Sequence, residues 1–121
     1  MVVDDDPLIQ LALGSMLTKL GCIAEKAMNG QLAIEMVNEK RSKGESCDII
    51  FMDVNMPVMN GYEATKEIKK NEDMKTAVIC SSGQDTLQHQ NLCKDAGMDD
   101  IVHKPFTIKE IKRVLNKYNL K

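Results

Sequence analysis

Short apolar runs alternate along the whole chain with stretches in which apolar residues recur every three or four positions. This alternation is typical of βα units that wind a parallel sheet with helices on both faces. We therefore expect an α/β fold, a doubly wound (βα)5 domain. The runs predict five strands, at residues 1–3, 22–27, 49–52, 77–80 and 101–103.

Residues that favour helix ends mark where the predicted helices begin and stop. Asp6 followed by Pro7 is a capping residue with proline at the first helical position. Asn29 precedes the second helix, and Gly97 stands where a left-handed residue would end the fourth. The positions expected to face the core are Ile9, Leu13, Met16, Leu17 and Leu20 in the first helix, Ala33, Met36 and Val37 in the second, Tyr62, Thr65 and Ile68 in the third, and Ile108, Ile111, Leu115 and Tyr118 in the last.

Length and composition narrow the class of protein. The 121 residues suit one domain over residues 1–121, although the first apolar run is so short that we expect a clipped strand and a longer parent chain. A net charge of -2 gives no reason to expect nucleic acid or a membrane as a partner. Four widely spaced cysteines without a C-x-x-C pair argue against a disulfide framework or a zinc site, and favour a cytoplasmic location. The lack of a long apolar run applies to these 121 residues alone, so a membrane anchor elsewhere in the parent protein remains compatible with the sequence.

Charged and hydroxyl side chains follow several of the predicted strands. Residues 4–6 are aspartates after the first strand, Asp53 follows the third, Ser82 the fourth and Lys104 the fifth. The carboxyl ends of parallel strands share one rim, so these side chains should meet there. Clustered carboxylates repel each other unless a cation joins them, and oxygen-only ligands suit Mg²⁺. A carboxylate nucleophile, a metal, an ammonium group and a hydroxyl together favour phosphoryl transfer.

The ordered set of motifs resembles the receiver domains of two-component signalling proteins, especially those of response regulators and hybrid histidine kinases. The likeness implies a flavodoxin-like sheet of strand order 2-1-3-4-5 and a phosphoacceptor function. It implies as partner a histidine kinase or a histidine phosphotransfer domain, with a phosphorylation-dependent dimer as a further possibility. The domain would catalyse its own phosphorylation and dephosphorylation without being a turnover enzyme. The matching segments are residues 2–7, 27–30, 52–64, 96–100 and 104–106.

The resemblance also implies roles for single residues around the metal. Asp53 would accept the phosphoryl group from a phosphohistidine. Asp5 would be the main acidic Mg²⁺ ligand, Asp4 would assist directly or through water, and the backbone carbonyl of Asn55 would complete the protein ligands. Asn55 and Gln84 would also modulate the lifetime of the phosphoryl group, and we expect spontaneous dephosphorylation.

The resemblance also implies that polar groups after the later strands complete the site. Lys104 would pair with Asp53 before phosphorylation, and the bond from Lys104 to Pro105 is expected to be cis. Ser82 is the expected switch hydroxyl, with Ser81 as the alternative. Ile101 stands where related domains often carry an aromatic residue, so aromatic switching cannot operate there.

The same residues also allow two other functions to be considered. A haloacid-dehalogenase type phosphohydrolase would need a second acid two residues after Asp53, where Asn55 stands. An inert binding module would keep the fold without the chemistry. His89 and His103 are not expected to bind metal, and Asp99 and Asp100 are expected to be turn residues.

Overall fold

A computed structural model of the chain describes residues 1–45, 47–54, 56, 59–70, 76–83 and 86–118. Within these ranges one parallel sheet has the strand order β2-β1-β3-β4-β5, which confirms the predicted α/β fold and its order. The strands are β1 (Val2–Val3), β2 (Lys26–Ala27), β3 (Ile49–Asp53), β4 (Ala77–Ser82) and β5 (Asp100–His103). The helices are α1 (Pro7–Lys19), α2 (Gly30–Ser42), α3 (Gly61–Lys69), α4 (Leu87–Ala96) and α5 (Ile108–Lys117).

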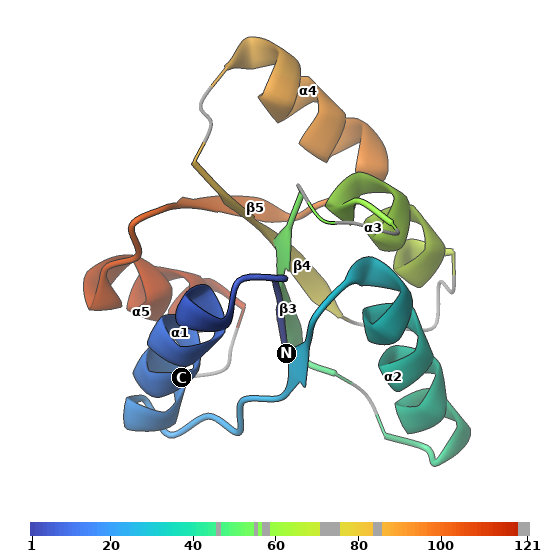
Figure 1. Cartoon of the computed structure of the whole chain (residues 1–121), viewed down its shortest axis with the longest axis horizontal. Helices are drawn as coiled ribbons and strands as arrows, with labels where there is room; N and C mark the ends of the chain where they lie inside the picture. Colours follow the sequence, from blue (N-terminus) through green and yellow to red (C-terminus); the bar gives the residue numbers. More distant parts are fainter. Residues whose placement is uncertain (46, 55, 57–58, 71–75, 84–85, 119–121) are drawn as a thin grey trace.

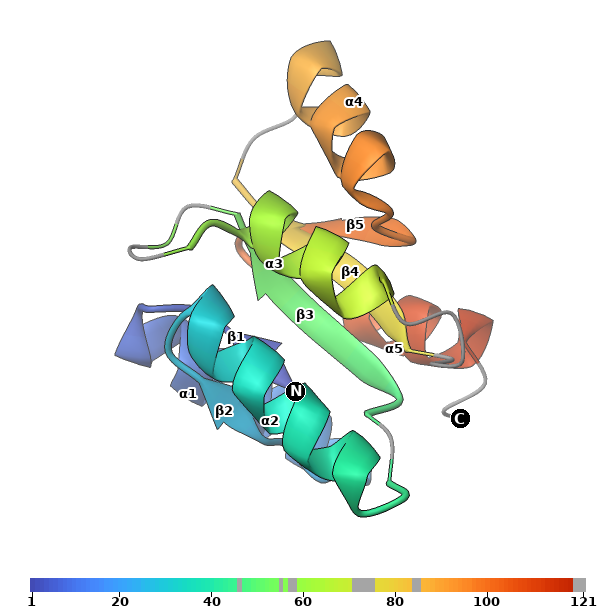
Figure 2. The same ribbon diagram turned by 90° about the vertical axis from the view of Figure 1, so that its right-hand side faces the viewer.

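Helices cover both faces of the sheet. Helices α1 and α5 lie together on one face (Figure 1), and Figure 2 shows α2, α3 and α4 on the other. Each face has its own buried apolar cluster, because alternate residues of a strand point to opposite faces. The first cluster joins Phe51 and Ile79 of the sheet to Leu13, Leu17, Ile111 and Leu115, and the second joins Ile50, Met52 and Val78 to Ala33, Val37, Ala64 and Ile68.

The register of the strands aligns their carboxyl ends. Val3 of β1 lies beside Met52 of β3, and Asp53 at the end of β3 lies beside Ser81 of β4. Ser82 in turn lies beside His103, the last residue of β5. The residues that follow β1, β3 and β5 therefore leave the sheet along one rim.

The predicted helix caps are confirmed. The Asp6 side chain accepts a hydrogen bond from the Leu8 amide, and Pro7 begins α1. The Asn29 side chain caps α2, and Gly97 ends α4 with φ of 93°, in the left-handed region that favours glycine.

Two aspartates after Gly97 have structural roles. Asp99 accepts a hydrogen bond from the Lys69 ammonium at 2.7 Å. Asp100 begins β5 and lies 3.2 Å from Arg113 and 3.1 Å from Lys117, both on α5. The prediction that both are turn residues is wrong for Asp100, which belongs to a strand.

Two sequence predictions about the sheet and core are wrong. The second strand has only the residues Lys26–Ala27, because it lies at the sheet edge and its sole neighbour β1 offers two partners, Val2 and Val3. Ile108 is 42% exposed, since it stands in the first turn of α5, before the helix meets the core at Ile111. No helix in the described part of the chain has the length and apolarity that crossing a bilayer requires.

Candidate functional site

Three aspartates from two strand ends meet at the rim. Asp4, Asp5 and Asp53 each offer a carboxylate oxygen, and these oxygens lie within 4.8 Å of one another. Asp4 and Asp53 are buried, at 1% and 6% exposure, whereas Asp5 is exposed. Asp4 is also held by the Asp6 amide, which donates to its Oδ1 at 2.9 Å. The predicted acidic cluster therefore forms, with Asp5 as its solvent-facing member.

Lys104 bridges the two buried carboxylates. Its Nζ lies 3.1 Å from Asp4 Oδ2 and 3.4 Å from Asp53 Oδ1. The peptide bond from Lys104 to Pro105 is cis, as expected. Burial alone would lower the pKa of Lys104, but the hydrogen bond to Asp4 and the charges of Asp53 and Asp4 raise it above its ordinary value of 10.5. Lys104 is thus a fixed positive charge at neutral pH, and its contact with Asp4 was not foreseen from the sequence.

A buried glutamine, which the sequence analysis missed, fixes the backbone around Asp4. Gln10 of α1 is 2% exposed. Its Nε2 lies 2.9, 3.0 and 2.9 Å from the carbonyl oxygens of Val2, Asp4 and Ala27, which share its two N–H groups. The available signal was a polar residue within the apolar stripe of the first helix, three positions before Leu13. Gln10 therefore joins α1 to the ends of β1 and β2.

The start of α3 packs directly against the backbone of Asp53. The Gly61 amide donates to the Val54 carbonyl at 3.1 Å. A Cβ at Gly61 would overlap the Asp53 carbonyl oxygen and lie 2.8 Å from Val54 Cα. Only glycine permits this close approach, so Gly61 sets the position of Asp53 relative to α3.

Both candidate serines lie at the end of β4. Ser81 and Ser82 are each 2% exposed. The Ser82 carbonyl accepts a hydrogen bond from the Lys104 amide at 2.8 Å, which fastens this residue to the strand that leads to Lys104. Ser81 is aligned with Asp53, and its Oγ has no hydrogen-bond partner among the described residues. The two expected modulating positions, Asn55 and Gln84, lie outside the described residues.

The charges and donor atoms of the rim fit a divalent cation. Three carboxylates and one ammonium leave an excess of two negative charges. Every candidate ligand among the described residues is a carboxylate oxygen, which suits Mg²⁺ better than a softer metal. The residues that could hold the ion are Asp4, Asp5 and Asp53. Beside that position Asp53 offers a carboxylate nucleophile, and Lys104 a cation for transferred oxygens.

Known proteins resemble this chain in sequence and in fold. The chain is 34% identical over 122 residues to hybrid signal transduction histidine kinase L of Dictyostelium discoideum, a match that covers 98% of this chain and 7% of that protein. It is 34% identical over 119 residues to the chemotaxis protein CheY of Thermotoga maritima, with 97% and 93% of the two chains covered. The receiver domain of a sensor histidine kinase of Pseudomonas aeruginosa, solved with a magnesium ion coordinated in its active site cleft, is 30% identical with a TM-score of 0.85, and the match covers 99% of this chain and 95% of that one.

The chain thus spans only a small part of the hybrid kinase and nearly all of the chemotaxis protein. The family model described as the response regulator receiver domain matches residues 1–116. This match and the carboxylates beside Lys104 point to the same family, and the chain belongs to the response regulator receiver domains of two-component signalling.

Proposed function

We propose that Asp53 accepts a phosphoryl group from a phosphohistidine of a histidine kinase or a histidine phosphotransfer domain. The observation that carries this proposal is the placement of Asp53 at the rim, 3.4 Å from the Lys104 ammonium and beside two further carboxylates. Asp53 is nearly buried, so its carboxylate is held in place by the fold before any donor arrives.

The reaction conserves atoms and charge in a simple way. A carboxylate oxygen of Asp53 attacks phosphorus, the bond between phosphorus and the donor imidazole nitrogen breaks, and the imidazole leaves with that electron pair and takes up a proton. Asp53 then carries an acyl phosphate. Lys104, already within reach of Asp53, contacts the transferred oxygens and offsets their charge.

Magnesium, held by Asp4, Asp5 and Asp53, supplies charge neutralisation for the phosphoryl oxygens when it is bound. Asp5 is the proposed main acidic ligand because it is accessible, and Asp4 assists from its buried position. The backbone carbonyl of Asn55 is the proposed fourth protein ligand. The magnesium ion in the related Pseudomonas receiver domain supports this choice of metal.

Ser82 is the proposed hydroxyl that responds to phosphorylation, with Ser81 as the alternative. The support is its backbone bond to Lys104, which couples the end of β4 to the ammonium. Asn55 and Gln84 are proposed to control how long the phosphoryl group persists.

The parent protein is proposed to be a hybrid histidine kinase, as in the Dictyostelium relative, rather than a single-domain regulator like CheY. A cytoplasmic location belongs to the same proposal, and the four free thiols suit a reducing compartment. The reading frame of the parent gene tests whether the parent protein is a hybrid histidine kinase, because it must then encode a kinase domain on the same chain.

Intact-mass measurement after incubation with acetyl phosphate and Mg²⁺ tests the phosphoacceptor. Wild type should gain one phosphoryl group, and Asp53→Asn should gain none. Asp6→Asn is a matched control, because asparagine also caps helices and Asp6 lies two residues from Asp4 without a proposed metal role. Equal labelling of wild type and Asp53→Asn would rule out this nucleophile.

A further inference from the structure

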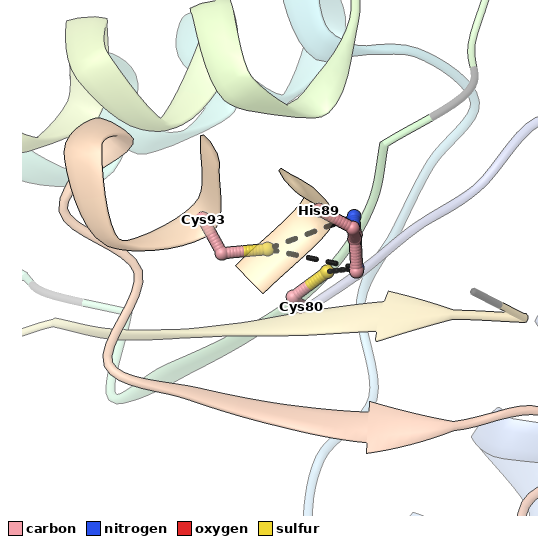
Figure 3. A group of neighbouring side chains, drawn as sticks. All are labelled: Cys80, His89 and Cys93. Atoms are coloured by element: carbon pink, nitrogen blue, oxygen red, sulfur yellow. Dashed lines mark hydrogen bonds between the residues drawn. The ribbon is translucent and has the colours of Figure 1, made fainter. Parts of the chain in front are cut away.

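A second cluster of metal-ligating side chains lies between β4 and α4, on the face of the sheet that α3 and α4 cover. It consists of Cys80 on β4 with His89 and Cys93 on α4 (Figure 3), and all three are buried. His89 and Cys93 are four residues apart, so they lie on one face of the helix. The sequence analysis expected neither a zinc site nor a metal-binding His89, because the approach of Cys80 to this helix face depends on the fold.

Two nitrogen-to-sulfur distances within the cluster are close to those of a tetrahedral zinc site. His89 Nε2 lies 3.5 Å from Cys80 Sγ and 3.7 Å from Cys93 Sγ. A zinc ion with bonds of about 2.3 Å to sulfur and about 2.0 Å to nitrogen at tetrahedral angles separates sulfur from nitrogen by about 3.5 Å. Cys93 Sγ also lies 4.0 Å from His89 Nδ1, so it sits beside the ring and off the axis of the Nε2 lone pair. An ion bound to Nε2 would therefore require the Cys93 side chain or the imidazole to turn before both sulfurs could reach it.

The other ring nitrogen of His89, Nδ1, contacts the hydroxyl of a tyrosine. Tyr62 Oη lies 2.6 Å from His89 Nδ1, and the two rings meet edge to face. Histidines that bind metal commonly donate their second N–H to an oxygen, which fixes the tautomer and the ring orientation. Tyr62 can accept that bond, and Nε2 is then the nitrogen that would bind the metal.

The charge of the proposed ligands favours Zn²⁺ over Cu⁺. Apolar neighbours, among them Val54 and Ile101, surround the thiols, and burial raises the pKa of both Cys80 and Cys93. A buried site is least costly when it carries no net charge. Two thiolates and a neutral imidazole balance Zn²⁺, whereas Cu⁺ would leave one negative charge. Binding would release the two thiol protons to solvent.

We propose that Cys80, His89 and Cys93 form a zinc-binding site that fastens α4 to β4, with Tyr62 as the positioning residue. Three protein ligands leave the fourth position of the ion for water or another small ligand. Cys80 stands two residues before Ser82, so the site would join α4 to the strand that ends at the phosphoacceptor rim. This site is separate from the carboxylates of that rim, and it does not depend on the proposed phosphoryl transfer.

Cobalt titration of the reduced, full-length chain in excess Mg²⁺ tests the proposal, because Mg²⁺ occupies carboxylates and only thiolate ligands give a sulfur-to-cobalt charge-transfer band. We expect this band and tetrahedral d–d bands to saturate at one equivalent and to disappear when Zn²⁺ is added. Cys93→Ser should weaken binding at least tenfold, and Tyr62→Phe by about 10–100-fold, as is usual for supporting residues. Cys22→Ser, the same change in a distant half-buried cysteine, should leave binding unchanged.

Alkylation of the wild-type protein gives a second test that needs no variant. Zn²⁺ should slow the modification of Cys80 and Cys93 at least tenfold under partly denaturing conditions, while Cys22 reacts at its usual rate, because metal bound to the folded form opposes opening. The absence of a charge-transfer band, equal affinity in wild type and Cys93→Ser, unprotected thiols, or binding of Cu⁺ but not Zn²⁺ would each overturn the assignment.

Discussion

Gly61→Ala should displace the phosphoacceptor without touching any side chain of the site. The added Cβ would overlap the Asp53 carbonyl oxygen and lie 2.8 Å from Val54 Cα and 2.9 Å from the Asp53 carbonyl carbon, where ordinary contact begins at 3.4 Å. All three atoms belong to the backbone, so no side-chain rotation can relieve the overlap. The end of β3 and the start of α3 must separate by about half an ångström or more.

The cost follows from this geometry. Overpacking typically costs about 1–3 kcal/mol, and a backbone clash belongs at the upper end. Alanine recovers up to about 1 kcal/mol through its higher helix propensity. A net loss of about 2 kcal/mol remains, which corresponds to a fall in Tm of roughly 6–10 °C for a domain of this size. Because a displacement of about 1 Å can cost a hundredfold in rate, we expect phosphorylation to slow at least tenfold.

Urea unfolding measures the loss of stability, and intact-mass measurement over time with acetyl phosphate measures the rate. Gly83→Ala is the matched control, since a Cβ there meets no atom of the described residues within 4 Å. We expect that control to stay within about 0.5 kcal/mol of wild type. If Gly61→Ala matched the control in both stability and rate, the proposed support of Asp53 by α3 would be refuted.

Three further changes probe the charges of the domain. Lys104→Met leaves Asp4 and Asp53 without their shared cation, so denaturation without metal should show a free energy of unfolding about 2 kcal/mol lower than in wild type. Mg²⁺ should raise the Tm of this variant more than that of wild type, and an equal rise would contradict this account. Asp53→Asn removes one repelling carboxylate, so Tm without metal should increase and calorimetry should show Mg²⁺ binding at least tenfold weaker; a lower Tm would count against mutual repulsion. Burial raises the pKa of Asp100, but a backbone N–H and the Arg113 guanidinium outweigh it and hold this pKa below its ordinary value of 3.8. The ionised Asp100 side chain therefore stabilises the fold fully above pH 3.8, and this stabilisation is lost as the pH falls through the lower pKa of the folded state. Denaturation at several pH values should therefore show Asp100→Asn about 0.5 kcal/mol less stable at pH 7 and equal to wild type in strong acid, and a gap that widened in acid would reverse the sign of this argument.

The location of the site was predictable because each relevant strand ends in a charged or hydroxyl residue. Asp53 follows four buried apolar residues, and Lys104 follows the last strand, so the shared rim of a parallel sheet brings them together. Periodicity alone identified these strand ends. The direct contact between Lys104 and Asp4 could not be predicted, since side-chain reach across β1 and β5 depends on the twist of the sheet and on neighbouring packing.

The misses share a physical cause, which is that local pattern does not reveal long-range partners. Residues 22–25 have a strand-like pattern, but the two-residue β1 offers no ladder for them, and Ile23 is 92% exposed. Cys80 is apolar in the sequence pattern, and only the crossing of α4 over β4 brings it to His89. Spacing within one helix was readable, whereas contacts between elements required the fold.

The two N–H groups of the Gln10 side chain, shared among three carbonyl oxygens, make the first helix and the adjoining strand ends a single mechanical unit. The backbone that carries Asp4 cannot loosen unless α1 moves with it, because the same amide holds Val2 and Ala27. Native-state hydrogen exchange should therefore report one shared opening event for these segments in place of independent fraying, and replacement of the amide would split that event in two.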